Sequence, residues 1–389
     1  MYSKEPLKEA EKRRLGSTAG GLKRGITTGT CAAAAAKGAA YMMFGKMVEQ
    51  VTVGLPGGMV LEIEVNREEG EDGKACFVKK YSGDDPDITA GMRIYAQVSL
   101  EKNFVGERIK ILGGRGIGRV TLPGLACKVG EPAINPVPKK MIAESVLEAF
   151  HELGYQGGGV VTLSIPQGEM LAEKTYNPRL GIKGGLSILG TAGIVEPMSS
   201  QALIDTIKVE MDVRKEAGAH YIILTPGNYG AQFLKNTYGE DGFYSVKCSN
   251  FVGESLDYAV EKGLKGLLFV GHIGKLVKVA AGIMNTHSAY ADGRMEILAA
   301  HAALLGGSRA LIETIMSSVT TDRAYDAIQC ESPALCAQVV EALLEKIKFH
   351  MEARTKGSML IHAIMFSNKE GFLGSTKGFE QDKMRYFKD

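Results

Sequence analysis

The densest group of chemically active side chains lies in residues 271–296, which read GHIGKLVKVAAGIMNTHSAYADGRME. Lys275 and Lys278 are three positions apart, so a helix would place them on one face, where they could bind ligand carboxylates. His272 and His287 could act as proton acceptors. In a purely structural interpretation the aspartate of this stretch caps the next helix, but this leaves the histidines and lysines unexplained. The pattern therefore favours a ligand site.

A second candidate is the loop of residues 24–30, RGITTGT, which precedes an alanine-rich run. Arg24, the hydroxyls of Thr27 and Thr28, and the start of a helix could together bind an anion. The alternative is a well-capped helix start with alanine chosen for close packing. The residues leave both interpretations open.

Three carboxylates gather in residues 83–87, GDDPD, around a proline. Such a cluster could bind Mg²⁺, act as a base, or form a solvated turn. A turn is the ordinary outcome. Because the cluster falls between two strand-like runs, a site with one of the three carboxylates as proton acceptor is the second interpretation.

Glycine-containing turns follow three predicted strands, at residues 190–193, 226–230 and 271–274. In an open α/β sheet such turns lie at the carboxyl edge, where small ligands bind and helix N-termini present free N–H groups. The alternative is that glycine only permits a tight turn between strand and helix. Three such turns together favour a nucleotide-like ligand.

Two familiar phosphate-binding motifs fail on inspection. Residues 271–276 lack the P-loop spacing and carry Leu276 where a hydroxyl for Mg²⁺ is needed. Residues 113–119 place Arg119 where the third glycine of a dinucleotide-binding fingerprint belongs. Neither stretch supports an ATPase or a nicotinamide enzyme.

The predicted elements divide the chain into an arm and two domains. Residues 1–21 are polar and predict a flexible arm, and residues 22–180 combine β-type runs with helices at 31–44 and 138–154, an α+β domain. In residues 181–389 short apolar strands alternate with helices. This rhythm predicts an α/β, Rossmann-like, doubly wound domain with a mostly parallel sheet.

Composition excludes several classes of protein. The 389 residues carry 46 Lys+Arg against 44 Asp+Glu, which argues against binding to nucleic acid or a membrane surface. We find no signal-peptide pattern and no apolar run of bilayer length. The 6 cysteines and 7 histidines are dispersed without metal-site spacing. We expect a cytoplasmic protein with reduced thiols and no metal site of its own.

Eight segments, spread in order over about residues 22 to 300, resemble those of a known family. They are GITTGTCAAAAAKGAA, SGDDPDIT, GGRGIGRVTLPGLACKVGEPAINPVPKKMI, GGLSILGTAGIVEPMS, TPGNYG, SNFVGESLD, GHIGKLVKVAAGI and NTHSAYADGRMEIL. The chain is similar to the cobalt-precorrin-5B C1-methyltransferases (cobalt-precorrin-6A synthases) of anaerobic cobalamin biosynthesis. The resemblance implies methyl transfer from S-adenosylmethionine to C1 of a cobalt-containing tetrapyrrole.

The implied reaction gives the candidate residues their roles. Polar loops would hold the methyl donor: Gly190, Thr191, Gly193, Glu196, Gly227 and Asn228. Cations and hydroxyls would bind the carboxylates of the macrocycle: Arg24, Thr27, Thr28, Arg115, Arg119, Lys275 and Lys278. Where the macrocycle must lose a proton, the candidate bases are Asp85, His272 and His287. We expect cobalt to enter only as part of the substrate.

Two other functions compete with this interpretation. A non-catalytic carrier or scaffold would bind the tetrapyrrole without needing S-adenosylmethionine. A phosphoryl transferase using the loop at residues 24–30 would bind ATP with Mg²⁺, against which the failed P-loop test argues. The oligomeric state is open, a homo-oligomer included.

Overall fold

The computed structural model describes residues 7–70, 73–239 and 244–387. Contacts between Cα atoms divide the chain into two compact units, Met1–Ser199 and Ser200–Asp389. Both units mix helices and strands, and each is described by itself. None of the helices in the described ranges is long and apolar enough to cross a membrane.

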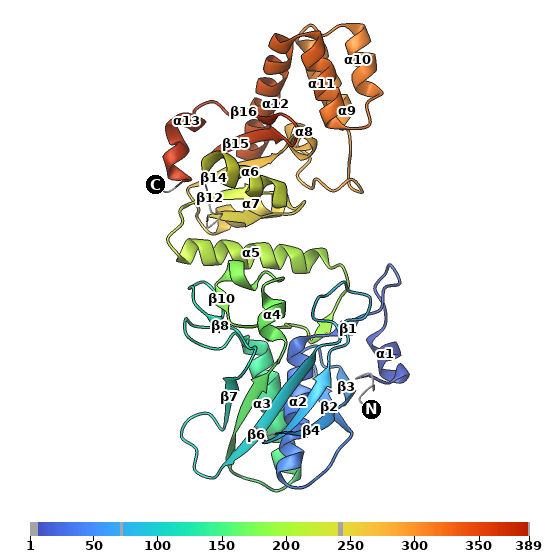
Figure 1. Ribbon diagram of the computed structural model, residues 1–389, viewed down its shortest axis with the longest axis vertical. Helices are drawn as coiled ribbons and strands as arrows, with labels where there is room; N and C mark the ends of the chain where they lie inside the picture. The colour runs from blue at the N-terminus through green and yellow to red at the C-terminus, as the bar shows by residue number, and fades with distance from the viewer. Residues whose placement is uncertain (1–6, 71–72, 240–243, 388–389) are drawn as a thin grey trace. The chain divides into compact units, whose positions relative to one another are not determined.

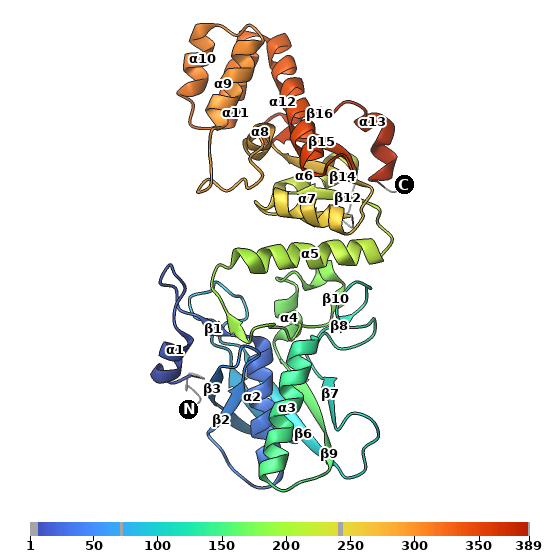
Figure 2. The ribbon, with the colours of Figure 1, turned by 180° about the vertical axis from the view of Figure 1, so that it is seen from behind.

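A mixed five-stranded sheet forms the centre of the N-terminal unit (Figure 1). In spatial order its strands are β4 (Asn66–Gly70), β5 (Gly73–Lys79), β6 (Arg93–Glu101), β9 (Gly158–Ser164) and β7 (Ile109–Gly113). All neighbours are antiparallel except β7 and β9, which are parallel. Helices α2 (Thr28–Met43) and α3 (Pro136–Glu152) lie together on one face of this sheet, in front of it in Figure 2.

Helix α2 owes its position to its alanines. The Thr27 side chain caps it, and its residues from Thr28 to Met42 are buried. Small side chains allow α3 and the sheet to approach α2 closely, which is why the run contains so few large residues. Its one cation, Lys37, is buried and bonds to Glu148 Oε2 at 2.7 Å and to the carbonyl oxygen of Thr52 at 2.9 Å.

Shorter elements complete the N-terminal unit. They are α1 (Glu9–Leu15), the pair β1 (Gly25–Ile26) and β11 (Ile194–Val195), the hairpin β2 (Gln50–Gly54) and β3 (Val60–Glu64), the pair β8 (Arg119–Val120) and β10 (Ile182–Lys183), and α4 (Gly168–Ala172) with a 3₁₀ turn at Asn177–Leu180.

The N-terminal segment differs from the predicted flexible arm. Helix α1 lies within it, and Leu7 and Leu15 on either side of its charged residues are buried in the core of the unit. Ser17 and Lys23 then form an antiparallel bridge. Two leucines are enough to dock a charged helix, and composition alone does not reveal this. Residues 1–6 of the predicted arm lie outside the described residues.

The C-terminal unit has a mostly parallel sheet. In spatial order its strands are β13 (Ser245–Lys247), β12 (Tyr221–Thr225), β14 (Gly266–His272), β15 (Leu360–Ser367) and β16 (Gly371–Ser375), of which only β16 is antiparallel to its neighbour. Its helices are α5 (Ser200–Glu216), α6 (Asn228–Tyr238), α7 (Val252–Glu261), α8 (Ile273–Ala280), α9 (Arg294–Leu304), α10 (Arg309–Met316), α11 (Thr321–Glu331), α12 (Pro333–Arg354) and α13 (Phe379–Asp382).

Both faces of this sheet are covered. Along β14, Leu267 and Phe269 pack into one apolar cluster, whereas Leu268 and Val270 pack into another. Helices α7, α8 and α12 contribute to the first cluster, and α6 and α13 contribute to the second. Such unbroken apolar strands are typical of a parallel sheet between two helical layers.

Residues 181–199 fall in the N-terminal unit, not in the second domain where the sequence analysis placed them. Strand β10 pairs with β8, and β11 pairs with β1. The predicted strand at residues 186–189 is a segment joined by single bridges to Ile117 and Ile134. Leu186 and Ile188 are buried and Leu189 is exposed, an alternation that a strand would also show, so the pattern did not distinguish these two outcomes.

Candidate functional site

The loop at residues 24–30 and the loop at residues 190–193 form one cluster. The backbone N–H of Thr27 donates to the Gly193 carbonyl at 3.1 Å, and that of Gly29 donates to the Leu189 carbonyl at 3.0 Å. A Cβ atom on Gly190 would lie 2.3 Å from Thr27 Oγ1, so this position requires glycine. Thr191 is exposed on the outside of the cluster. Two loops that the sequence proposed separately therefore lie together.

The threonine hydroxyls of this cluster are engaged inside the protein. Thr27 Oγ1 accepts from the N–H of Thr30 at 3.2 Å, which caps α2. The Thr28 hydroxyl lies 3.1 Å from the Leu189 carbonyl oxygen and 2.9 Å from the Leu189 nitrogen. Both residues are buried. Their contacts agree with the interpretation of this loop as a capped helix start.

A charged rim borders the threonine cluster. Arg24 Nη2 lies 3.1 Å from Glu196 Oε1, and both side chains are partly exposed. Asp85 Oδ1 accepts from the N–H of Met198 at 3.0 Å. Met198 has a φ of 54°, an uncommon backbone conformation for a residue other than glycine. The half-buried Asp85 and the Arg24–Glu196 pair are thus held by the same chain segment.

The other two aspartates of residues 83–87 have structural contacts. Asp84 Oδ2 accepts from the N–H of Lys23 at 2.7 Å. Asp87 forms an ion pair with the buried Lys80 and accepts from Thr89. Burial by itself raises the pKa of Asp87, but Lys80 and the hydrogen bonds lower it overall. Asp84 and Asp85 thus each accept one backbone hydrogen bond, whereas Asp87 is taken up by Lys80 and Thr89.

In the C-terminal unit the polar residues gather where β12, β13 and β14 end. Strand β12 lies between β13 and β14, so the chain continues from β12 to β13 on one side and then crosses to β14 on the other side. At such a reversal of strand order, α/β sheets bind ligands beyond the carboxyl ends of the strands. Lys275 Nζ donates to the Pro226 carbonyl at 3.2 Å and to Asn250 Oδ1 at 2.8 Å. Burial lowers the pKa of Lys275. One ammonium group therefore ties together three strand ends.

The start of α6 belongs to the same edge. Asn228 Oδ1 accepts from Lys247 Nζ, and a Cβ on Gly230 would lie 2.9 Å from the Val270 carbonyl oxygen, so α6 sits close on the sheet. Thr225 is buried at the end of β12, and its Oγ1 has no hydrogen-bond partner among the described residues. A Cβ on Gly230 would also lie 3.0 Å from Thr225 Cβ, so the Thr225 side chain is enclosed beneath the first turn of α6.

The remaining candidates of residues 271–296 have mixed surroundings. Lys278 is buried and donates to the carbonyls of Thr286 and Ala291 at 3.2 and 2.9 Å, so it holds this loop from inside. His287 is exposed, and its Nδ1 accepts from the N–H of Ala289 at 3.1 Å. Burial lowers the pKa of Lys278.

His272 is fixed at both ring nitrogens. Its Nδ1 accepts from the N–H of Gly274 at 3.1 Å and caps α8. Its Nε2 lies 3.4 Å from Asp322 Oδ1, which also accepts from the Ser367 hydroxyl at 2.9 Å. Because Nδ1 already accepts a hydrogen bond, the proton of the neutral ring is on Nε2. This arrangement leaves no nitrogen lone pair for a substrate proton.

The two arginines proposed for the substrate lie on neighbouring loops of the N-terminal unit. Arg119 Nη1 donates to the Gly130 carbonyl at 3.0 Å. Arg115 is exposed, and its carbonyl oxygen accepts from the N–H of Ile165 at 2.8 Å. Arg115 thereby lies beside the turn that follows β9.

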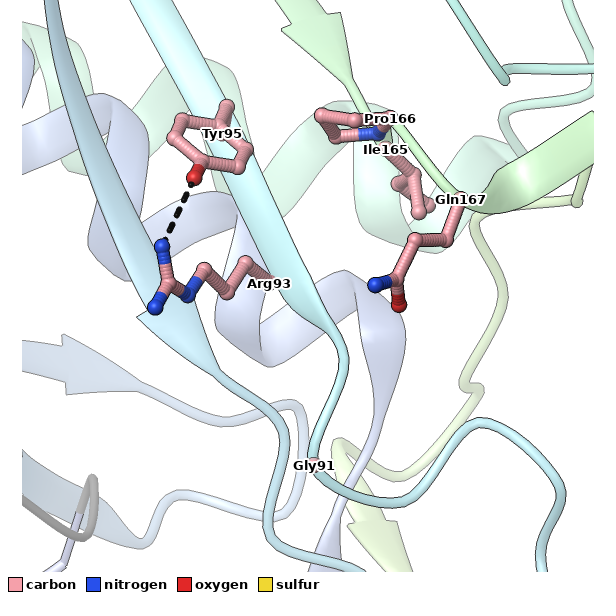
Figure 3. Close-up of a pocket in the computed structure, with 6 residues that line it drawn as sticks. All are labelled: Gly91, Arg93, Tyr95, Ile165, Pro166 and Gln167. Atoms are coloured by element: carbon pink, nitrogen blue, oxygen red, sulfur yellow. Dashed lines mark hydrogen bonds between the residues drawn. The ribbon is translucent and has the colours of Figure 1, made fainter. Parts of the chain in front are cut away.

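That turn lines a pocket of about 350 Å³ (Figure 3). The lining residues are Gly91, Arg93, Tyr95, Ile165, Pro166 and Gln167. None was a candidate from the sequence. One feature of the sequence could have indicated this pocket. Residues 93–97 read Arg-Ile-Tyr-Ala-Gln, and this alternation predicts a strand with one apolar face and one polar face. We return to this pocket below.

Across the described part of the chain, no group of three or more His, Cys, Asp or Glu side chains is placed to hold a metal ion.

Two family models match the chain, CbiD over residues 16–197 and the CbiD C-terminal domain over residues 285–377. The cobalt-precorrin-5B C(1)-methyltransferase of Ruminiclostridium cellulolyticum is 49% identical over 350 residues, covering 89% of each chain. The chain belongs to this methyltransferase family. The predicted resemblance is confirmed.

Other members of the family match over similar lengths. The enzyme of the same name from Listeria monocytogenes is 42% identical and covers 92% of this chain and 95% of its own. A crystal structure of the cobalamin biosynthesis protein cbiD from Archaeoglobus fulgidus shares 33% identity over 69% of this chain and 83% of that chain, with a TM-score of 0.39. The first family model ends at residue 197, close to the division between the two units.

Proposed function

We propose that the chain transfers a methyl group from S-adenosylmethionine to C1 of cobalt-precorrin-5B, giving cobalt-precorrin-6A in anaerobic cobalamin biosynthesis. The observation that carries the proposal is 49% identity, over 89% of both chains, to a cobalt-precorrin-5B C(1)-methyltransferase. When bound, the donor supplies an electrophilic methyl group, which the ring carbon takes while the S–C bond electrons stay on sulfur. The task of the protein is to align donor and acceptor carbons at about 3–3.5 Å.

The donor is assigned to the strand ends of the C-terminal unit. We take its sheet as a Rossmann-like, doubly wound one, with the ligand edge between β12 and β14. Gly227 and Asn228 begin α6, whose N-terminus suits the donor's carboxylate. Lys275, whose ammonium bonds to Pro226 and Asn250 at the same strand ends, supplies a cation. These groups fit a small ligand that carries both a carboxylate and hydroxyls.

The threonine cluster is assigned to the macrocycle. Arg24 is partly exposed and is oriented by Glu196, so it could exchange this partner for a substrate carboxylate. Thr191 is exposed on the loop that carries Glu196, whereas Gly190 and Gly193 pack against Thr27 and Thr30 and shape this loop. This assignment leaves Glu196 on the substrate side and makes Gly227 and Asn228 the donor contacts. The sequence had proposed both loops, residues 190–196 and residues 227–228, as contacts of the methyl donor.

Asp85 is the proposed proton acceptor. One of its oxygens is fixed by the N–H of Met198, which orients the carboxylate next to Arg24 and Glu196. His272 is the weaker candidate, because its Nδ1 accepts from the N–H of Gly274 and its Nε2 lies 3.4 Å from Asp322 Oδ1. His287 keeps Nε2 available but is exposed to solvent.

Calorimetric titration with S-adenosylhomocysteine tests the donor assignment, with ATP and Mg²⁺ as the control. We expect saturable binding of the former alone, in the presence of tetrapyrrole if binding is ordered. Tetrapyrrole binding without any binding of S-adenosylhomocysteine would support a carrier and overturn the proposal.

A further inference from the structure

Strand β6 has two chemically different faces. Ile94, Ala96 and Val98 are buried in the core beneath α2 and α3. The alternating residues Arg93 and Tyr95 therefore point to the opposite face of the sheet. The strand thus presents a cation and a phenol on a surface that the core does not use.

The pocket lies on this second face. Figure 3 shows Arg93 and Tyr95 on one side of it and Ile165, Pro166 and Gln167 on the other. The Arg93 guanidinium lies 4.9 Å from the centre of the Phe77 ring, and its Nη1 lies 3.4 Å from Tyr95 Oη. Ring contact and hydrogen bond hold the cation in one orientation, which favours recognition of a planar anion.

Two further cationic residues adjoin the lining residues through the backbone, Lys79 beside Arg93 and Arg115 beside Ile165. Lys79 pairs with Arg93 across the strands, and a Cβ on Gly91 would lie 3.7 Å from Lys79 Cε. Arg115 accepts a backbone hydrogen bond from Ile165, and its guanidinium makes no hydrogen bond or ion pair within the described ranges. Arg93 is therefore the cation in the lining, and Lys79 and Arg115 are the neighbouring residues whose flexible side chains could reach the cavity.

One carboxylate offsets these cations. Glu68 Oε2 lies 3.9 Å from Arg93 Nη1 and accepts from the Tyr95 hydroxyl at 3.0 Å. Glu68 is not among the six residues that line the pocket, and none of those six is acidic. The pocket therefore keeps an excess of positive charge.

We infer that this pocket binds a carboxylate side chain of the tetrapyrrole substrate, which rests on the function proposed above. Arg93, with Arg115 and Lys79 nearby, would pair with the carboxylate, and the Gln167 amide could donate to it. Ile165 and Pro166 provide an apolar wall for the methylene groups that carry the carboxylate. The volume of about 350 Å³ suits an acetate or propionate arm but not a whole macrocycle. The site is thus a substrate-positioning pocket.

Three variants test the inference in the full-length protein. Arg93→Gln and Arg115→Gln remove one cation each, and Arg309→Gln removes a guanidinium that is 93% exposed on α10 as a matched control. We expect the first two to raise the KM for cobalt-precorrin-5B about tenfold and to leave kcat and the KM for S-adenosylmethionine unchanged. The control should behave like the wild type.

A second readout does not depend on turnover. Uroporphyrin III is a planar tetrapyrrole with acidic side chains, and its fluorescence reports binding. We expect wild type and Arg309→Gln to bind it alike, and Arg93→Gln and Arg115→Gln to bind it about tenfold more weakly, with a smaller salt dependence. If Arg93→Gln does not fold, Arg115→Gln still tests the inference. The Arg115 guanidinium has no hydrogen-bond or ion-pair partner among the described residues, so its removal should not affect folding.

The outcomes separate this inference from the proposed function. Methyl transfer with an unchanged KM and unchanged porphyrin binding in both variants would overturn the pocket and leave the function standing. Porphyrin binding that weakens in both variants, in a protein without methyl transfer, would support the pocket and overturn the function. No porphyrin binding by the wild type would overturn the inference.

Discussion

At the scale of single residues, Lys275 is a cation of the C-terminal unit whose hydrogen-bond partners are both uncharged. It bonds to the carbonyl of Pro226 and to Asn250, and burial lowers its pKa. A half-buried cation that bonds to uncharged oxygens keeps part of its charge uncompensated. It is therefore available to a ligand carboxylate.

Lys275→Met should weaken binding of S-adenosylhomocysteine about tenfold or more, because a hydrogen bond to a charged group contributes ~1.5–3 kcal/mol. Calorimetry measures this change. Lys235→Met on the same unit removes an exposed lysine of α6 and serves as the control. Equal affinities in the two variants would contradict the donor assignment.

Asp85→Asn should lower kcat about a hundredfold or more, since a positioned general base contributes at least that factor. The amide oxygen can still accept from the N–H of Met198, so the segment should stay in place. Asp84→Asn is the matched control, because Asp84 is the neighbouring aspartate and also accepts a backbone hydrogen bond, from the N–H of Lys23. A wild-type kcat in Asp85→Asn would exclude this carboxylate as the base.

Single residues also show where sequence reasoning reached its limit. Lys275 and Lys278 were predicted together from their spacing, yet Lys278 is buried and bonded to two carbonyls. Spacing places two side chains on one face of a helix but does not tell which of them the next loop covers. Arg93 and Tyr95 were missed because the lining of their pocket comes from segments far apart in the sequence.

At the scale of elements, the start of α2 was the most predictable part of the fold. The alanine run and the threonine cap are local signals, and the helix begins at Thr28, near the predicted residue 31. The partner of this helix start was not predictable. Residues 189–195 contact it through backbone hydrogen bonds, which leave no mark on the sequence except the glycines.

Gly190→Ala should destabilise the N-terminal unit by ~1–3 kcal/mol or more, because φ is 136° there and the new Cβ would lie 2.3 Å from Thr27 Oγ1. Gly184→Ala separates the two causes. It also has a positive φ, 75°, but a Cβ there meets nothing within 4 Å. Urea unfolding of both variants measures the difference. An equal loss in both would mean that the contact with Thr27 is unimportant.

The contact between His362 of β15 and Asp382 of α13 should make the free energy of unfolding depend on pH. His362 is buried in β15, with Nδ1 2.9 Å from Thr376 Oγ1 and Nε2 3.2 Å from Asp382 Oδ2. Burial lowers its pKa below 6.5, although Asp382 opposes this. As the pH falls below 6.5, the imidazole of His362 takes up a proton more readily in the unfolded state than in the folded state. The stability that His362 contributes is therefore present above pH 6.5 and is lost as the pH falls through the pKa of the folded state.

Thermal unfolding between pH 8 and pH 5 checks this expectation. The Tm of the wild type should fall more steeply below pH 6.5 than that of His362→Asn, which cannot take up the proton. Parallel curves for the two proteins would show that His362 does not cause the pH dependence.

At the scale of the whole molecule, the chain carries two sheets of different construction. The N-terminal sheet is mixed and has a polar pocket on one face, whereas the C-terminal sheet is mostly parallel and covered on both faces. The alternation of strands and helices predicted the second sheet. The boundary was misplaced because residues 181–199 pair with strands far earlier in the chain.

Transfer of a labelled methyl group tests the central claim most directly. The purified protein is incubated with cobalt-precorrin-5B and S-adenosylmethionine that carries ¹³C in its methyl group, and the product is examined by NMR. We expect one labelled methyl on C1 and an equal amount of S-adenosylhomocysteine. An unlabelled, unchanged macrocycle that is nevertheless bound by the protein would contradict the methyltransferase and leave a carrier.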